Sequence, residues 1–188
     1  MITATEASGL YSAADKTDAD ELKIDGTVYN AANVYLTNAD LLGVNVKYYY
    51  RDSDAPRRDV LLCAVAADNK ILEISSDDII SYDGGRYTYE KDGKKKEVLL
   101  PSSVITIYNG VYDADNEVFS PQCGKVVLTD NNFDGKYDVL NIHDVTYTVI
   151  QRVLVSEGNL MIFDKYNSEC NIVIKDYENT PFKIYDAK

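Results

Sequence analysis

The sequence predicts an all-β fold of two small tandem β-barrel or β-sandwich units, built from short antiparallel strands with at most one or two single-turn helices. Short apolar runs recur along the chain, and Gly, Asn, Asp and Pro residues separate them at regular spacing, a pattern typical of small all-β units. The 188 residues include 16 tyrosines and no tryptophan. Tyrosine fits a pleated, half-buried surface with its hydroxyl at the wet edge, so this enrichment also favours strands.

Breaks in the apolar pattern divide the chain into four segments. Residues 1–21 mix small and acidic residues with little periodicity, which predicts an arm or linker. Residues 109–124 lose the strand pattern again and are punctuated by Gly, Asp, Asn and Pro, as in a connecting segment. We therefore predict an arm or linker at 1–21, a first β unit at 22–110, a linker at 111–124 and a second β unit at 125–188.

Alternation and Asp-Gly turns define the strands of the first unit. Asp25-Gly26 and Asp92-Gly93 each stand beside strand-like runs, which is a hairpin signal. Val60–Ala66 is apolar on both faces, which predicts a central strand covered from two sides. The lysines at 94–96 are interpreted as charges on an exposed edge rather than as a binding patch. The other predicted strands are Val44–Tyr50, Ile71–Ile74, Tyr87–Glu90, Lys96–Leu100 and Val104–Tyr108, and Asn38–Gly43 and Ser76–Ile80 each fit one short helical turn.

The second unit is predicted to contain a hairpin followed by a longer strand. Val145 to Val155 places valines and Tyr147 on one face, interrupted at Gln151, where we expect a bulge. The other predicted strands are Val126–Leu128, Val139–Ile142, Leu160–Phe163, Asn171–Lys175 and Phe182–Tyr185.

An acidic loop between two of these strands has the spacing of calcium ligands. Within residues 130–138, oxygen-bearing side chains stand at positions 1, 3, 5 and 9, and a glycine stands at position 6, where a sharp bend is needed. Calcium prefers hard oxygen donors, and alternate positions of a loop can direct them to one point. The predicted calcium ligands are Asp130, Asn132, Asp134, the backbone carbonyl of Lys136, and Asp138.

The loop is not an EF-hand, because position 12 is Asn141 instead of a bidentate glutamate. It resembles the D-x-[DN]-x-D-G-x-x-D loops between strands of integrin-type and other extracellular β-proteins, where the last aspartate leads into a strand. The alternative is a solvated hairpin in which Asp134-Gly135 only supplies a turn with positive φ.

A second acidic group, Asp113, Asp115 and Glu117, is a weaker candidate for a cation site. It lacks a glycine bend and a fourth ligand, so we interpret it as part of a solvated linker. The three cysteines, Cys63, Cys123 and Cys170, have no C-x-x-C spacing, and they predict neither a disulfide framework nor a zinc site.

The net charge and the scarcity of reactive side chains exclude several classes of function. The formal net charge of −12 disfavours binding to nucleic-acid phosphate or anionic lipid, and the sequence has no apolar run long enough to span a bilayer as a helix. His143 is the single histidine, and we expect it in a strand near a turn. No hydrolase, P-loop or dinucleotide-binding motif is present. We therefore predict a protein that is not an enzyme, although a glycosidase-type carboxylate pair stays open.

An internal similarity relates residues 47–63 to residues 125–142. Both segments read as an apolar triplet, an acidic turn and an Asp-Val-Leu strand start. In the first copy Pro56 and Arg57 stand where the second has Asp134 and Gly135, so it would keep the scaffold without the cation. This similarity raises the hypothesis of a duplication.

The order of segments is similar to uncharacterised Tyr- and Asp-rich β segments of large surface-layer-associated proteins of Gram-positive anaerobes and of large bacteriophage virion structural proteins. The segments concerned are TATEASGLYS, ELKIDGTVY, DLLGVNVKYYYRD, LPSSVITIYNGVY, GKVVLTDNNFDGKYDVLNI and TYTVIQRV. This resemblance implies a non-catalytic structural or interaction module of a larger extracellular, cell-surface or virion assembly. Its partners would be other protein subunits or the rest of a longer chain.

The alternative prediction is a carbohydrate-binding module or glycan-processing domain. Exposed aromatic rings would bind the glycan in that case, and the candidates are Tyr48, Tyr49, Tyr50, Tyr87 and Tyr89.

Overall fold

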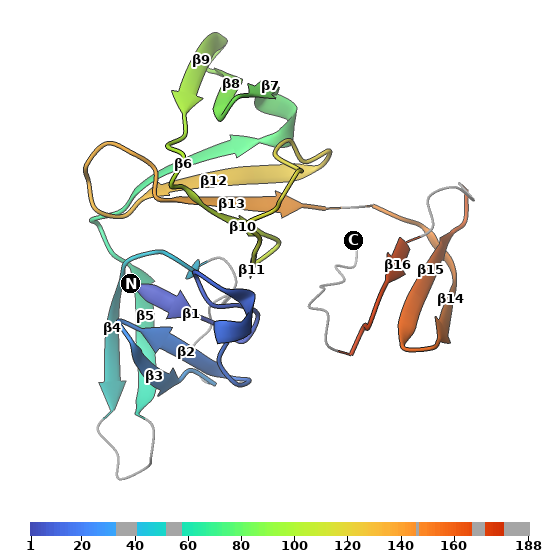
Figure 1. Ribbon diagram of the computed structural model, residues 1–188, viewed down its shortest axis with the longest axis horizontal. Helices are drawn as coiled ribbons and strands as arrows, with labels where there is room; N and C mark the ends of the chain where they lie inside the picture. The colour runs from blue at the N-terminus through green and yellow to red at the C-terminus, as the bar shows by residue number, and fades with distance from the viewer. Residues whose placement is uncertain (33–40, 52–57, 146, 167–171, 179–188) are drawn as a thin grey trace. The chain divides into compact units, whose positions relative to one another are not determined.

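The computed structural model describes residues 1–32, 41–51, 58–145, 147–166 and 172–178. It confirms the all-β prediction: the strands of these residues form four small sheets, and none of the four closes into a barrel (Figure 1). The helical elements in the described ranges are two short 3₁₀ turns, η1 (Ala13–Asp15) and η3 (Ser76–Asp78). None of the described helices is long and apolar enough to cross a membrane. Part of the predicted turn Asn38–Gly43 lies outside the described residues.

The N-terminal sheet has the strand order β1-β2-β3-β5-β4. Its inner strand β5 pairs with β3 on one side and with β4 on the other, which agrees with the predicted central strand. The predicted cover on both faces is incomplete, because Val65 is 48% exposed. The strands are β1 (Ile2–Ala4), β2 (Glu21–Ile24), β3 (Thr27–Asn30), β4 (Val46–Arg51) and β5 (Asp59–Val65).

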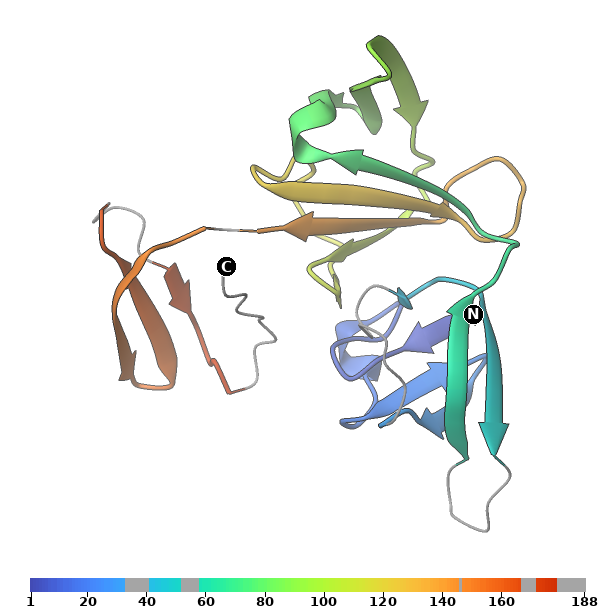
Figure 2. The same cartoon turned by 180° about the vertical axis from the view of Figure 1, so that it is seen from behind.

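The central sheet has the order β11-β10-β13-β12-β6 (Figures 1 and 2). Strand β13 pairs antiparallel with β12 and parallel with β10, while β12 pairs antiparallel with β6. The strands are β6 (Lys70–Ser75), β10 (Ile105–Tyr108), β11 (Val111–Tyr112), β12 (Gly124–Asp130) and β13 (Val139–Asp144).

Residues on both faces of the central sheet contribute to hydrophobic cores. Because successive residues of a strand point to opposite faces, Val139 belongs to one hydrophobic core, together with Leu22 and Ile24 of the N-terminal sheet. Leu140 and Ile142 belong to a second core. This second core also contains tyrosines of the third sheet, which consists of β7 (Ile79–Asp83), β8 (Arg86–Lys91) and β9 (Lys94–Leu99). As expected, the lysines at 94–96 lie on an outer strand, since β9 ends the order β7-β8-β9.

The C-terminal sheet consists of β14 (Ile150–Ser156), β15 (Asn159–Asp164) and β16 (Ile172–Ile174). The predicted bulge near Gln151 is present as a register shift between Ile150 and Arg152. The predicted longer strand is wrong in its first part, because residues 147–149 are not in a strand. The Asp164 carboxylate accepts hydrogen bonds from the Thr148 hydroxyl and the Val149 N–H, which replaces strand pairing there. The predicted strand Phe182–Tyr185 lies outside the described residues.

The domain boundaries differ from those expected. The chain divides into a unit at Met1–Val145 and a second unit at Thr146–Lys188. Strands on both sides of the expected linker at 111–124 share the central sheet, and β11 lies within that linker. The expected arm at 1–21 contains β1 as well as Ile2 and Leu10, which are 0% and 1% exposed in the first core. Pairing between strands distant in the chain has no local sequence signal, so the break in the local pattern at 111–124 does not mark a domain boundary.

Candidate calcium-binding loop

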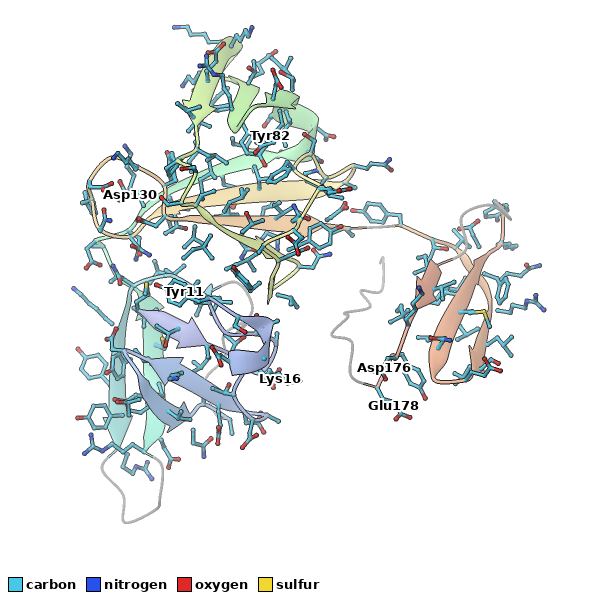
Figure 3. The ribbon with its side chains drawn as sticks, viewed as in Figure 1. Tyr11, Lys16, Tyr82, Asp130, Asp176 and Glu178 are labelled. Carbon is cyan, nitrogen blue, oxygen red and sulfur yellow. The ribbon has the colours of Figure 1, made fainter. Side chains whose placement is uncertain are left out.

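The candidate loop, residues 130–138, joins two neighbouring strands of the central sheet. Strands β12 and β13 are antiparallel, with Thr129 opposite Val139. The Asp138 N–H donates to the Thr129 carbonyl at 2.8 Å and closes the base of the loop. The ladder therefore holds both ends of the loop, and Figure 3 labels Asp130 at the point where β12 enters it. We call these nine residues the acidic loop.

Asp130, at position 1, is the buried residue of the acidic loop. This residue is 1% exposed. The Oδ2 atom accepts a hydrogen bond of 3.0 Å from the Gly135 N–H across the loop, so the carboxylate is directed into the loop. The Oδ1 atom is buried and has no hydrogen-bond partner. Buried carboxylate oxygens are costly unless they are paired or coordinate a cation.

Local turns shape the remainder of the acidic loop. The Asn132 Oδ1 atom accepts from the Asp134 N–H at 2.9 Å, and the Asp134 Oδ1 atom accepts from the Lys136 N–H at 2.8 Å. Gly135 has φ of +88° with no atom within 4 Å of a Cβ built on it, so glycine is needed there for its backbone conformation and not for space. The glycine at position 6 therefore makes the bend that the sequence predicted.

Asp138, at position 9, faces back into the acidic loop. Its Oδ2 atom accepts from the Asn131 N–H at 2.9 Å, and its Oδ1 atom accepts from the Asn132 Nδ2 atom at 3.3 Å. The first and last carboxylates of the loop are thus both bonded to other residues of the same loop.

The structure brings the five predicted ligand residues into one loop but does not gather their carboxylates around a point. Among the described residues, no group of three or more His, Cys, Asp and Glu side chains is placed to hold a metal. Asn132 and Asp134 are exposed and bonded to the backbone beside them. Exposed side chains can reorient without opening a core, and each carboxylate has two oxygens. The donor set of carboxylates, an amide and a carbonyl is the one calcium prefers, and the unpaired Oδ1 atom of Asp130 would be a buried first ligand.

Sequence reasoning missed Asn131, which connects the acidic loop to Gly43 and Asn45. Its Nδ2 atom donates to the Gly43 carbonyl at 2.8 Å, and its own carbonyl accepts from the Asn45 side chain. Position 2 of the loop is not a ligand position, and its partners lie 88 and 86 residues away in the sequence. No local pattern could have identified this residue.

The five tyrosines predicted as glycan ligands differ in exposure: Tyr49 and Tyr50 are 68% and 42% exposed and stay candidates, and Tyr48 is half-buried. Tyr87 and Tyr89 are 0% and 7% exposed in the second core, so they are corrected from ligand candidates to core residues. The Tyr48 hydroxyl is hydrogen bonded to the Tyr29 hydroxyl at 3.3 Å, and that bond, with burial, raises the pKa of Tyr48 to about 12. The Arg58 guanidinium lies over the Tyr50 ring at 4.9 Å.

The other candidate residues occupy structural positions. His143 lies in β13 opposite Lys125, as expected of a strand residue. The Asp113 Oδ1 atom accepts from the Asp115 N–H at 3.2 Å in a local turn. Cys63 and Cys123 are free cysteines, and burial raises the pKa of the Cys63 thiol. Cys170 lies outside the described residues.

A comparison with protein-family models finds no match to this chain, and comparisons with curated proteins and with solved structures find none either.

Proposed function

We propose that this protein is a non-catalytic structural or interaction module of a larger extracellular, cell-surface or virion assembly, and that one calcium ion stabilises its acidic loop. The observation that supports the calcium site best is the buried, unpartnered Oδ1 atom of Asp130 at position 1 of the loop. The all-β architecture, the acidic surface and the resemblance stated above support the setting. Partners would be other protein subunits or the remainder of a longer chain.

Calcium would stabilise the folded chain because it binds an arrangement that the unfolded chain lacks. Binding to the native state alone adds RT ln(1 + [L]/Kd) to the free energy of unfolding. Extracellular calcium modules have Kd values of about 0.1–1 mM. At ten times Kd the gain is about 1.4 kcal/mol, which corresponds to a rise in Tm of roughly 3–6 °C for a chain of this size.

Thermal melts with calcium and with chelator test this proposal. Calcium at about ten times Kd should raise the Tm of the wild-type protein relative to EDTA. The variants Asp130→Asn and Asp134→Ala should lose that rise, because each removes a carboxylate ligand. Asp113→Ala is the matched control, since Asp113 makes the same kind of side-chain turn outside the acidic loop, and it should respond to calcium as the wild type does.

Isothermal titration of the wild-type protein separates binding from stability. Heat of calcium binding that disappears in Asp130→Asn is the expected result. Superimposable wild-type melts in calcium and EDTA, together with no binding heat, would overturn the calcium site.

A further inference from the structure

We propose that calcium in the acidic loop also stabilises the contact between that loop and the N-terminal sheet, through Asn131, so that ion occupancy regulates how firmly the two are joined. This inference rests on the proposed calcium site. It concerns a group of residues that we call the junction, defined as Gly43, Asn45, Asn69 and Asn131. The hydrogen bonds among them link three segments of the first unit.

Asn131 lies between the ligand positions Asp130 and Asn132, and its polar groups bond in two directions. Its N–H donates to the Asp138 carboxylate at 2.9 Å, which holds the acidic loop closed. Its side chain donates to the Gly43 carbonyl at 2.8 Å, and its carbonyl accepts from Asn45. The loop is therefore bonded to the segment at 43–45 through one residue that is not itself a ligand.

The segment at 43–45 is in turn bonded to the N-terminal sheet. The Gly43 N–H donates to the Ile2 carbonyl at 2.9 Å, and the Ile2 N–H donates to the Val44 carbonyl at 3.0 Å. Ile2 belongs to β1 and is 0% exposed in the first core. A change in the position of residues 43–45 would therefore reach a core strand.

Asn69 connects the junction to the chain that crosses between the two sheets. Its Oδ1 atom accepts from the Asn45 N–H at 2.9 Å, and its Nδ2 atom donates to the Asn45 carbonyl at 2.8 Å. Asn69 stands in the turn between β5 of the N-terminal sheet and β6 of the central sheet. The junction thus includes the covalent crossover and the acidic loop together.

An ion would act on the junction through the loop conformation. Without a cation the acidic loop contains three carboxylates and the unpaired buried Oδ1 atom of Asp130, so mutual repulsion and desolvation favour opening. A bound cation compensates the charges and fixes positions 1 and 3, and Asn131 between them is held in place for Gly43. Linkage requires the reverse as well: loss of the junction must weaken calcium binding by the same factor.

The experiment uses the full chain with calcium or EDTA and reads two quantities. Hydrogen–deuterium exchange of peptides covering residues 41–46 and 66–70 reports on the junction, and isothermal titration with calcium chloride reports on affinity. Wild-type protein should exchange more slowly at both peptides with calcium. Asn131→Ala should still bind calcium, about tenfold more weakly, and calcium should no longer slow exchange at residues 41–46.

Two further variants make the test specific. Asn45→Ala removes the donor to the Asn131 carbonyl from the other side and should reproduce the behaviour of Asn131→Ala, which covers the case where one variant fails to fold. Asn30→Ala is the control, because Asn30 makes a side-chain bond to Asp59 in the N-terminal sheet, and it should behave as wild type.

The outcomes separate the two proposals. If the wild-type protein binds no calcium, the proposed calcium site fails and the junction mechanism fails with it. If it binds calcium but exchange at 41–46 is equal in calcium and EDTA, only the junction mechanism is overturned. Wild-type affinity together with calcium-dependent protection in the Asn131 and Asn45 variants would also overturn it.

Discussion

Asp130 and Asn131 are consecutive residues of the acidic loop, but their side chains make different contacts. Asp130 offers a buried carboxylate oxygen without a hydrogen-bond partner, and Asn131 bonds the loop to Gly43 and Asn45. Exchanging one carboxylate for an amide at position 130 changes the charge but not the shape. Truncating the amide at position 131 changes the connection but not the predicted ligand set.

Tyr108 gives the protein a predictable response to alkaline pH. Burial, followed by the hydrogen bond of 2.8 Å from its hydroxyl to Asp144, raises the pKa of Tyr108 to about 12. An unfolded tyrosine has a pKa of about 10, so the unfolded chain releases this proton first. The contribution of Tyr108 to the free energy of unfolding should therefore be constant below a pH of about 10. It should decrease as the pH rises toward 12.

Urea unfolding at several pH values across that window measures the effect. Tyr108→Phe should show a shallower decline than wild type, and part of the decline should persist because the pKa of Tyr48 is also raised to about 12. Tyr11→Phe is the control, since Tyr11 is 63% exposed. Parallel pH profiles for wild type and Tyr108→Phe would contradict the prediction.

Local turn chemistry explains the two Asp-Gly hairpins. Asp92-Gly93 joins β8 and β9 with φ of +57° and +68°, and Asp25-Gly26 joins β2 and β3 with φ of +49° and +84°. Positive φ at both central residues defines the turn whose twist matches paired strands. These hairpins were predictable because the signal lies entirely within the turn.

Two glycines with positive φ should differ in their tolerance of a side chain. A Cβ at Gly93 would meet nothing within 4 Å, whereas at Gly43 it would lie 2.7 Å from Val139 and 3.0 Å from Leu10. Gly93→Ala should therefore lower the free energy of unfolding by about 1 kcal/mol, from the backbone alone. Gly43→Ala should lower it by roughly 3 kcal/mol, because overpacking is added.

Chemical denaturation of the two glycine variants provides the comparison, with Gly158→Ala as a second open-turn control. Equal losses at Gly43 and Gly93 would show that the core yields to the added methyl group.

Pairing between distant strands marks the limit of sequence-based prediction. The spacing of oxygen-bearing residues identified the acidic loop, and alternation identified most strands. The pairing of β6 with β12 joins Lys70 to Asp130, and the Asn131 contact reaches Gly43. Such partners are selected by packing in the folded chain, so no window of the sequence contains the information.

Nearly all buried hydrophobic residues among those described lie in the first unit. Both hydrophobic cores consist of residues from Met1–Val145. In the second unit Ile162, at 5% exposed, is the one buried hydrophobic residue among those described. All seven residues of β14 are exposed. Isolated small sheets of this kind have little independent stability.

Truncation after Val145 should therefore preserve the fold of the first unit. A protein of residues 1–145 should unfold cooperatively with a Tm within a few degrees of that of the full chain, as followed by circular dichroism or calorimetry. Residues 146–188 alone should show no cooperative melt. A broad, non-cooperative transition for residues 1–145 would contradict this division.

The topology also bears on the duplication hypothesis. Strands β4 and β5 form an antiparallel pair, as β12 and β13 do. In each pair the second strand has a parallel partner, β3 for β5 and β10 for β13. The turn of the first copy, with Pro56 and Arg57, lies outside the described residues. The shared topology supports duplication, which stays a prediction.

The parallel pairing of β10 with β13 affects when the central sheet can form during synthesis of the chain. Strands β6 and β10 leave the ribosome before β12 and β13, the two strands that pair with them. Strand β6 has no partner in this sheet until β12 is complete at residue 130, and β10 lacks β13 until residue 144 has been translated. Until then Ile74 and Ile107 have no finished sheet to join. The hairpin of β12 and β13 forms locally and fast. We therefore expect the central sheet to form as soon as this hairpin has left the ribosome.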